Sequence, residues 1–317
     1  MSKGWETPVQ VLYISPMEYG DNSSLDAMSH SIDYTLSQAG IELRVAYADF
    51  RAEGWLPRTE DLIRECVTAD VSAIVLYVID PSEPADAVAY ARAHGVRVIS
   101  IERPRFDVDA SLVYPNFNHG IYMAEYLSRL LPLGARVGVV GGPGTADDDE
   151  LVLGIVHGVR LYGLTCVNDP EDPRYKNVTD VRAGGAEKTA NLLADFPELD
   201  ALVPYNDETA LGAIDALKAA ARLGTMRTIS RNGTPSLVQL VKEGFHDGTW
   251  DLDTLGIGRA VAELAIRLLI DDEDLDGLCI ASPIGYMITR DRVHRWVPWE
   301  QRIQYRPLQK WQSLTAR

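Results

Sequence analysis

The chain has 317 residues and a mass of 35.0 kDa, which is enough for about two globular domains with buried cores. Hydrophobic residues make up 46% of the sequence and charged residues 24%, which excludes a wholly disordered or collagen-like chain. The formal net charge of -16 at pH 7 would repel a phosphate backbone, and no basic patch offsets it, so we expect no nucleic-acid partner.

The sequence contains no apparent membrane span or secretory signal, and its three cysteines form no recognisable motif. The longest apolar stretch, Ala73 to Ile79, is far shorter than the roughly 18 residues of a membrane span, so we expect no direct membrane insertion. No secretory signal precedes the first strand-like run, which leaves two locations open: periplasmic, if a leader was removed, or cytoplasmic. Cys66, Cys166 and Cys279 form no CxxC pair, which favours free thiols over a disulfide or a zinc site.

Strand-like and helix-like segments alternate from the start of the chain, which is typical of a parallel sheet with crossover helices. The first part predicts strands at residues 9–15, 41–48, 71–79 and 96–101, and helices that begin near residues 22–24, 59–61 and 84. These strands are short, apolar and rich in β-branched residues, as strands buried on both faces should be. We therefore expect them to form one sheet.

The alternation restarts with a helix at residues 119–131, and a second sheet is expected. Its predicted strands lie at 136–140, 164–167, 201–204, 228–230 and 248–252. The accompanying helices are predicted at 150–162, 183–196, 208–221, 235–243 and 256–269. No low-complexity linker interrupts the pattern. The sequence thus predicts an α/β protein with two doubly wound parallel sheets.

Motifs for catalysis, metals and cofactors are absent from the sequence. Residues 141–144 (GGPG) lie between a strand and a helix, but Asp147 stands where a dinucleotide fingerprint needs a small residue. The acidic run 147–150 would repel a pyrophosphate, so we interpret the segment as a plain turn. The histidines show no metal-ligand spacing, and the acidic run 271–274 lacks the glycine of an EF-hand. We expect no metal and no cofactor.

Polar side chains follow several predicted strands, at the edge where open α/β sheets bind ligands. The set comprises Tyr19 and Asn22 after the first strand, Glu102 and Arg103 after the fourth, and Asn206, Asp207, Arg231 and Asn232 after later strands. Each has a structural alternative, because Asn22 and Asp207 could cap helices and Arg103 could form a surface ion pair. Their shared location is what indicates a binding site.

The same segments resemble the type I periplasmic sugar-binding proteins, the ribose/galactose-binding family, whose fold also serves LacI-type repressors as an effector domain. Residues 205–213 (YNDETALGA) are very similar to the family's ANDEMALGA. Further similarities are Asp80-Pro81 to its DP, residues 102–104 (ERP) to its DRP, residues 231–235 (RNGTP) to its FDGTP, and residues 114–127 to its hinge-then-helix element. The resemblance spans roughly residues 8–290.

This resemblance implies two lobes joined by three chain crossings, near residues 114–117, 250–254 and 283–287. The N-terminal lobe would comprise residues 1–116 and 253–284, and the C-terminal lobe residues 117–252 and 285–317. It further implies reversible capture of a sugar, polyol or sugar-like solute in the interlobe cleft, with closure on binding. We expect a monomer that serves an ABC importer or a sensor kinase and performs no catalysis.

The resemblance also implies the ligand-binding residues, namely Tyr19, Asn22, Glu102, Arg103, Tyr205, Asn206, Asp207, Arg231, Asn232, Trp250 and Asp251. Three positions depart from the family pattern: Asn232 replaces an Asp, Leu151 an Arg and Leu252 a Gln or similar polar residue. The alignment around Leu252 could slip by one residue, which would bring Asp251 or Asp253 into the cleft instead. We therefore expect a fully hydroxylated pentose to bind poorly. The aromatic faces of Tyr19, Tyr205 and Trp250 favour a ligand with an extended apolar face, although Trp250 could instead fill the core.

Three other functions are alternatives to solute capture. A cytoplasmic ligand sensor agrees with the free thiols and with the lack of a leader. An enzyme on this fold would need a positioned acid and base, for which Glu102 and Asp207 are the candidate pair. A LacI-type repressor would need a helix-turn-helix headpiece, and only residues 1–8 precede the first predicted strand.

Overall fold

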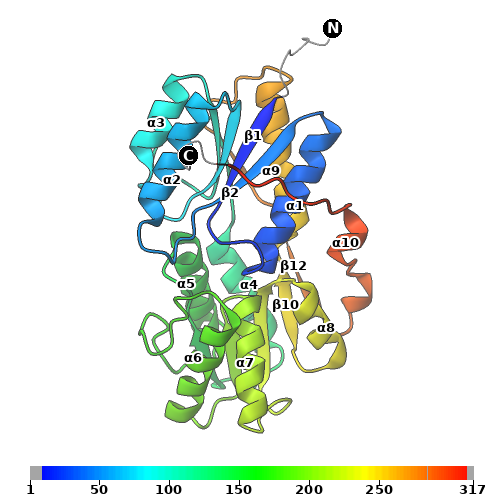
Figure 1. Cartoon of the computed structure of the whole chain (residues 1–317). Coiled ribbons are helices and arrows are strands. Elements are labelled where there is room, and N and C mark those ends of the chain that lie inside the picture. The colour runs from blue at the N-terminus through cyan, green and yellow to red at the C-terminus, as the bar shows by residue number, and fades with distance from the viewer. Residues whose placement is uncertain (1–8, 284, 313–317) are drawn as a thin grey trace. The chain divides into compact units, whose positions relative to one another are not determined.

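The structure is a computed structural model that describes residues 9–283 and 285–312. The chain divides into two compact units (Figure 1). Within the described residues, unit 1 comprises residues 9–114, 254–283 and 299–312, and unit 2 comprises residues 115–253 and 285–298. Each unit contains a six-stranded sheet flanked by helices, which confirms the predicted α/β fold with two wound sheets.

Unit 1 has the strand order β11-β5-β4-β3-β1-β2, and all of its pairings are parallel. Its strands are β1 (Gln10–Ser15), β2 (Glu42–Tyr47), β3 (Ala73–Tyr77), β4 (Arg97–Ile101), β5 (Ala110–Val113) and β11 (Leu278–Ala281). Its helices are α1 (Ser23–Gln38), α2 (Trp55–Thr68), α3 (Ala85–Ala93), α9 (Thr254–Leu269) and α10 (Trp299–Arg302).

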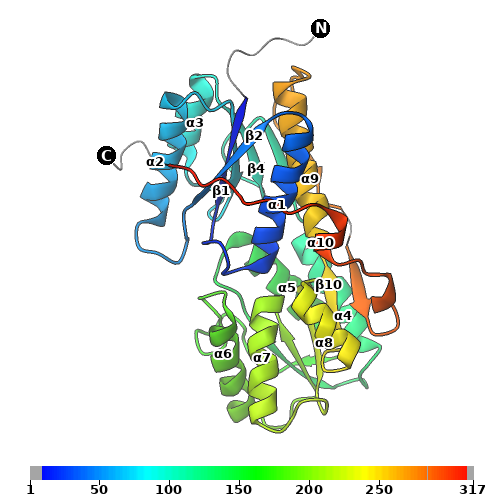
Figure 2. The same ribbon diagram turned by 45° about the vertical axis from the view of Figure 1, so that its right-hand side comes forward.

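Helix pairs flank the unit 1 sheet, with α1 packed against α9 and α2 against α3 (Figure 2). The central strands β1 and β3 are buried along almost their whole length because helices flank the sheet and their residues are apolar. Helices α1 and α9 approach closely at Gly258, where an added Cβ would lie 2.7 Å from the carbonyl oxygen of Met28. The hydroxyl of Ser31 donates to the carbonyl of Leu255 at 2.6 Å and links the same two helices.

Unit 2 has the strand order β12-β10-β9-β8-β6-β7. Its strands are β6 (Arg136–Val140), β7 (Thr165–Cys166), β8 (Ala201–Pro204), β9 (Arg227–Asn232), β10 (Gly248–Asp251) and β12 (Tyr286–Thr289). Its helices are α4 (Asn116–Ser128), α5 (Ala146–Leu161), α6 (Arg182–Asp195), α7 (Asp207–Ala219), α8 (Pro235–Glu243) and the 3-10 turn η1 (Val293–Arg295). Helix α4 packs on α5 and α6 on α7.

Three strands lie in segments that the sequence pattern left as loops: β5, β11 and β12. Each has four residues. Strand β11 alternates between half-buried and exposed residues, and β12 is an edge strand that pairs antiparallel with β10. The edge strands β11 and β12 lack the continuous apolar run that marks a central parallel strand, and β5, between β11 and β4, has only four residues, so the sequence signal was too weak to identify them.

The final described segment differs from the expected domain division. Residues 299–312, expected in the C-terminal lobe, pack on unit 1, so the chain passes between the units a fourth time after Pro298. In both views this segment runs past α1 and across β2 toward α2 (Figures 1 and 2). Its contacts are a parallel bridge between Lys310 and Val45, and a hydrogen bond of 2.9 Å from Trp311 Nε1 to Glu65. The segment 299–312 thus pairs with the outer edge of β2 at Val45.

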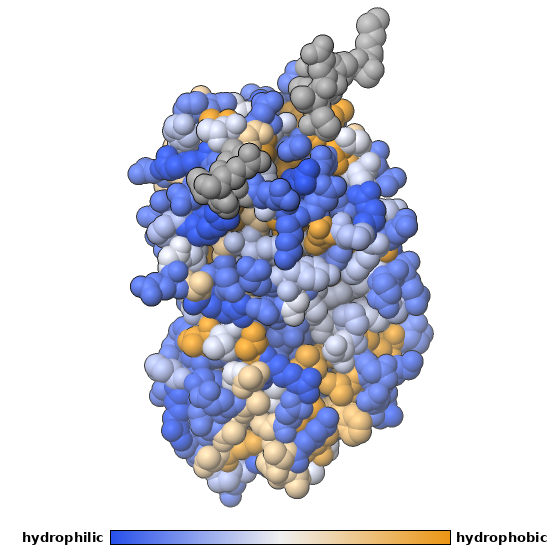
Figure 3. All heavy atoms as spheres, viewed as in Figure 1, coloured by the Kyte–Doolittle hydropathy of each residue, from blue (hydrophilic) through white to orange (hydrophobic). Residues whose placement is uncertain are grey.

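Hydrophilic residues cover most of the face drawn in Figure 3. In the described part of the chain, no helix combines the length and the apolar character that spanning a membrane requires.

Candidate functional site

The two candidate residues after β1 in unit 1 differ in exposure and in hydrogen-bond partners. Tyr19 is half exposed, and its hydroxyl lies 3.1 Å from Nε2 of His30. Asn22 is buried at the N-terminus of α1, where its Oδ1 accepts from the backbone N–H groups of Ser24 at 3.1 Å and Leu25 at 3.3 Å. Asn22 therefore has the capping role that was its structural alternative.

Glu102 and Arg103 follow β4. Glu102 adopts a φ of 72°, and its N–H donates to the carbonyl of Leu112 in β5 at 2.8 Å. Arg103 is exposed, and its Nη2 lies 3.7 Å from Sγ of Cys279 in β11, beside a cavity of about 540 Å³. In the strand order, β11 and β1 lie on opposite sides of β4. The Arg103 guanidinium thus lies on the side of β4 opposite to β1, the strand that precedes Tyr19.

In unit 2, Tyr205 and Asn206 meet Asp180 at the end of β8. The Tyr205 hydroxyl and the Asn206 Nδ2 both donate to Oδ1 of Asp180, the latter at 2.6 Å. Asn206 also caps α7, because its Oδ1 accepts from the N–H of Thr209 at 2.9 Å. All three partners are buried, and burial together with the nearby carboxylates of Asp180 and Asp148 raises the pKa of Tyr205.

Asp207 lies fully inside unit 2. Its carboxylate accepts from the Ser230 hydroxyl, from the Thr249 hydroxyl at 2.7 Å and from the Thr234 N–H at 2.7 Å. Burial raises its pKa to about 7, although these donors oppose the shift. Asp207 therefore ties β9, β10 and the start of α8 together, and this internal role argues against its action as a catalytic base.

Arg231, at the end of β9, is buried and bonded to two other elements. Its Nη1 donates to Oδ1 of Asn116 at 2.7 Å, and its Nη2 donates to Oδ1 of Asp148 at 3.2 Å. The next residue, Asn232, has a φ of 132° and is also buried. The polar side chains at the ends of β8 and β9 thus form two buried hydrogen-bonded clusters in unit 2, one around Asp180 and one around Arg231.

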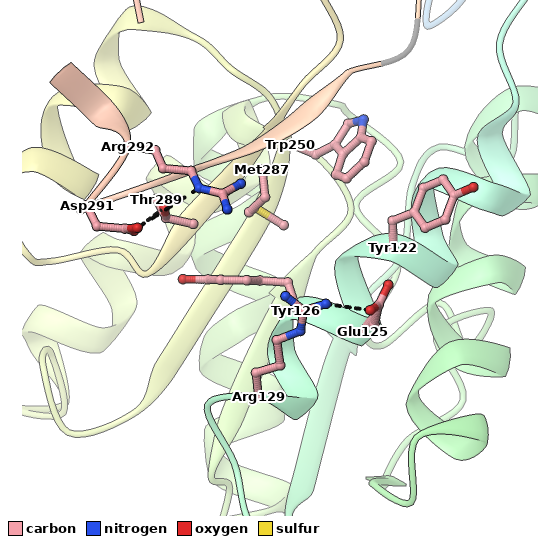
Figure 4. A pocket seen from close by; sticks show the side chains of 9 residues that line it. All are labelled: Tyr122, Glu125, Tyr126, Arg129, Trp250, Met287, Thr289, Asp291 and Arg292. Carbon is pink, nitrogen blue, oxygen red and sulfur yellow. Dashed lines mark hydrogen bonds and ion pairs between the residues drawn. The ribbon is translucent and has the colours of Figure 1, made fainter. Parts of the chain in front are cut away.

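Trp250 and Asp251 occupy consecutive positions in β10 and therefore point to opposite faces of the sheet. The Trp250 ring stacks on Tyr122 with ring centroids 5.5 Å apart, and it lies equally close to the ring of His119. It lines a cavity of about 500 Å³ between α4 and strands β10 and β12 (Figure 4). Asp251 is buried, and its Oδ1 accepts from the N–H of Asp253 at 2.8 Å.

Four site residues escaped the sequence reasoning: Asn116, Asp147, Asp148 and Asp180. Asp147 and Asp148 were noticed as a reason against pyrophosphate binding, and nothing in the sequence showed that they face Arg231 or Tyr205. Gly142 was the one sequence feature that bears on the contact between Asp148 and Tyr205. A Cβ at this position would lie 2.9 Å from Cβ of Asp148 and 3.0 Å from Cε2 of Tyr205, so glycine permits these two side chains to meet.

Two wound α/β units, joined by several chain passages and carrying polar side chains at the carboxyl ends of their strands, define a two-domain binding-protein fold. The chain matches the family model described as periplasmic binding protein domain over residues 15–273. It therefore belongs to the periplasmic binding protein family, and the resemblance drawn from the sequence motifs is confirmed. This is a family of binding proteins rather than of enzymes.

Two curated relatives and one solved structure illustrate the similarity. A D-ribose/D-allose-binding protein of Pseudomonas aeruginosa is 25% identical over 193 residues, which cover 58% of each chain. The ribose import binding protein of Bacillus subtilis is 25% identical over 253 residues, which cover 78% of each chain. A periplasmic solute binding protein of an Actinobacillus succinogenes ABC transporter, solved with bound D-allose, shares the fold with a TM-score of 0.80 at 18% identity, covering 92% of this chain and all of that one.

Proposed function

We propose that this protein captures a small polyhydroxylated solute reversibly and presents it to an ABC importer or a sensor. The observation that carries the proposal is the pair of buried polar clusters of unit 2, in which Asn206 and Arg231 lie at the ends of β8 and β9 and Asp148 lies in the first turn of α5. The names of the relatives, which bind ribose and allose, support a sugar-like solute. As the family name implies, we place the protein in the periplasm.

The proposed binding requires no catalytic residue. Asp207, one half of the candidate acid-base pair, is fully buried and already accepts three hydrogen bonds from unit 2. The contribution of Tyr19, Glu102 and Arg103 of unit 1 to this site remains a prediction.

Two positions where the resemblance implies hydrogen-bonding side chains carry leucine in this chain. Leu151 is wholly buried and Leu252 nearly so, and neither offers a polar atom to a solute. A buried sugar hydroxyl without a partner costs about 1 to 3 kcal/mol. We therefore expect unmodified ribose to bind weakly, and tight binding of ribose would contradict this part of the proposal.

A thermal-shift screen of sugars, polyols and aromatic glycosides tests the function. A solute that binds the folded state alone raises the melting temperature as its concentration increases. We expect at least one polyhydroxylated compound to give a saturable rise. Correctly folded protein that responds to none of these compounds would contradict the proposed function.

A further inference from the structure

Carboxylate side chains gather at the strand ends of unit 2. Asp147 and Asp148 belong to the first turn of α5, and Asp180 precedes α6. All three are at least nine-tenths buried. The Tyr205 hydroxyl donates to Asp180, and Cβ of Asp148 and the Tyr205 ring both lie against Gly142, so the two carboxylates lie around the same side chain.

The positive charge next to these carboxylates comes from Arg231. Its guanidinium is shared between Asp148 and Asn116. Burial raises the pKa of Asp148 well above its ordinary value, and the Asp147 charge adds to the rise more than the Arg231 charge opposes it. The surroundings of Asp148 therefore favour an additional positive charge.

A metal ion is not the source of that charge that the geometry favours. In the described part of the chain, no group of three or more His, Cys, Asp or Glu side chains is arranged so that it could hold a metal ion.

One buried donor beside the carboxylates has no acceptor. Within residues 9–283 and 285–312, Nε of Arg231 makes no hydrogen bond, although the residue is only 4% exposed. A buried polar group without a partner costs about 1 to 3 kcal/mol, which a bound molecule with acceptor oxygens would relieve.

We propose, on the basis of the proposed function, that the preferred solute is a polyhydroxylated molecule that carries a primary ammonium group, such as an amino sugar or an amino cyclitol. The ammonium group donates to the carboxylates of Asp147 and Asp148, and a hydroxyl oxygen accepts from Nε of Arg231. A buried ammonium is tolerated where carboxylates pair with it. A neutral sugar of the same shape leaves the negative charge of this site uncompensated.

Matched sugars test this assignment at constant shape. The full chain is titrated calorimetrically at pH 7 with glucose, glucosamine and N-acetylglucosamine, with the corresponding galactose series, and with inositol and an amino-inositol. We expect the amine in at least one series to bind at least tenfold more tightly than both neutral forms. Neutral forms that bind as tightly as the amine in every series would overturn the amine assignment and leave the proposed function intact, whereas binding of no compound would contradict both.

Charge-neutralising variants locate the effect. Asp147→Asn keeps the shape of the side chain, and we expect it to reduce the ratio of amine to neutral affinity about tenfold. The control is Asp149→Asn in the same helical turn, where the native carboxylate lies 3.5 Å from Lys176 Nζ and is partly exposed. It should leave that ratio unchanged. Because a ratio is compared, a general loss of stability cannot imitate the result, and equal ratios in both variants and the parent would overturn the role of Asp147.

Discussion

Arg231 and Asp148 form an ion pair of 3.2 Å between β9 and the first turn of α5, and both side chains are almost wholly buried. Removing the cation leaves a buried carboxylate without its partner, which costs about 3 to 5 kcal/mol. We expect Arg231→Met to lower the free energy of unfolding by about 3 kcal/mol in urea. Arg174→Met, which breaks the exposed pair with Asp195, should lower the unfolding free energy far less, because water screens that pair. Similar losses in the two variants would show that the Arg231 pair is not buried in solution.

Gly142 permits the close approach of Asp148 and Tyr205. A methyl group there would lie 2.9 Å from Cβ of Asp148 and 3.0 Å from the Tyr205 ring. Because overpacking of this kind costs about 1 to 3 kcal/mol, Gly142→Ala should lower the unfolding free energy by that amount and weaken solute binding. The control is Gly138→Ala in β6, whose new Cβ would meet the flexible Leu199 side chain at 3.1 Å. If Gly142→Ala bound the solute with normal affinity, the contact between Asp148 and Tyr205 would not be part of the binding site.

His246 makes unit 2 sensitive to acid. Its ring lies between the hydroxyls of Thr228, 2.8 Å from Nδ1, and Ser230, 3.0 Å from Nε2. Burial lowers its pKa from 6.5 to about 3. The folded state therefore holds the neutral ring while the unfolded chain binds a proton below pH 6.5, and this contribution to stability is lost as the pH falls from about 6.5 toward 3.

The pH dependence can be isolated with one variant. Between pH 6 and 4, His246→Gln should remove up to about 1.4 kcal/mol per pH unit from the slope of unfolding free energy against pH. His94→Gln is the control, because that ring is exposed and should leave the slope unchanged. If both variants retained the parent slope, the buried ring would not be the acid-sensitive group.

The chain end stabilises unit 1 through Trp311. Its Nε1 donates to Glu65, its N–H donates to the carbonyl of Val45 at 2.8 Å, and its ring packs against the core beneath α2. Trp311→Ala should lower the unfolding free energy by about 1 to 3 kcal/mol and speed hydrogen exchange at the Val45 amide. Gln309→Ala changes an exposed side chain while its backbone carbonyl still accepts from Val45, so exchange there should stay slow. Fast exchange at Val45 in the parent protein would contradict this packing.

The regular part of the fold was predictable because buried parallel strands have continuous apolar runs. Strands β1 and β3 and the capping of α1 by Asn22 all follow from local sequence. The edge strands β11 and β12 carry no such run, and the bridge between Lys310 and Val45 joins segments too distant for any local pattern.

The candidate ligand-binding residues stay a prediction, but the sequence did single out several polar side chains that the structure buries at strand ends. Strand-end polarity and the YNDETALGA motif led to Asn206 and Arg231, which belong to two buried hydrogen-bonded clusters of unit 2. Trp250 was expected either at the ligand or in the core, and it stacks on Tyr122 at a cavity in unit 2. The carboxylates of Asp148 and Asp180 were missed because their significance depends on contacts with Arg231 and Tyr205, which only the tertiary structure provides.

The central claim is reversible capture of a polyhydroxylated solute without chemical change. Calorimetric titration of the purified chain with the best compound from the thermal-shift screen, followed by mass spectrometry of the released compound, tests it directly. The account predicts saturable binding at one solute per chain and recovery of the solute with its mass unchanged. Recovery of a converted product, or binding that survives in the Arg231→Met variant with undiminished affinity, would contradict it.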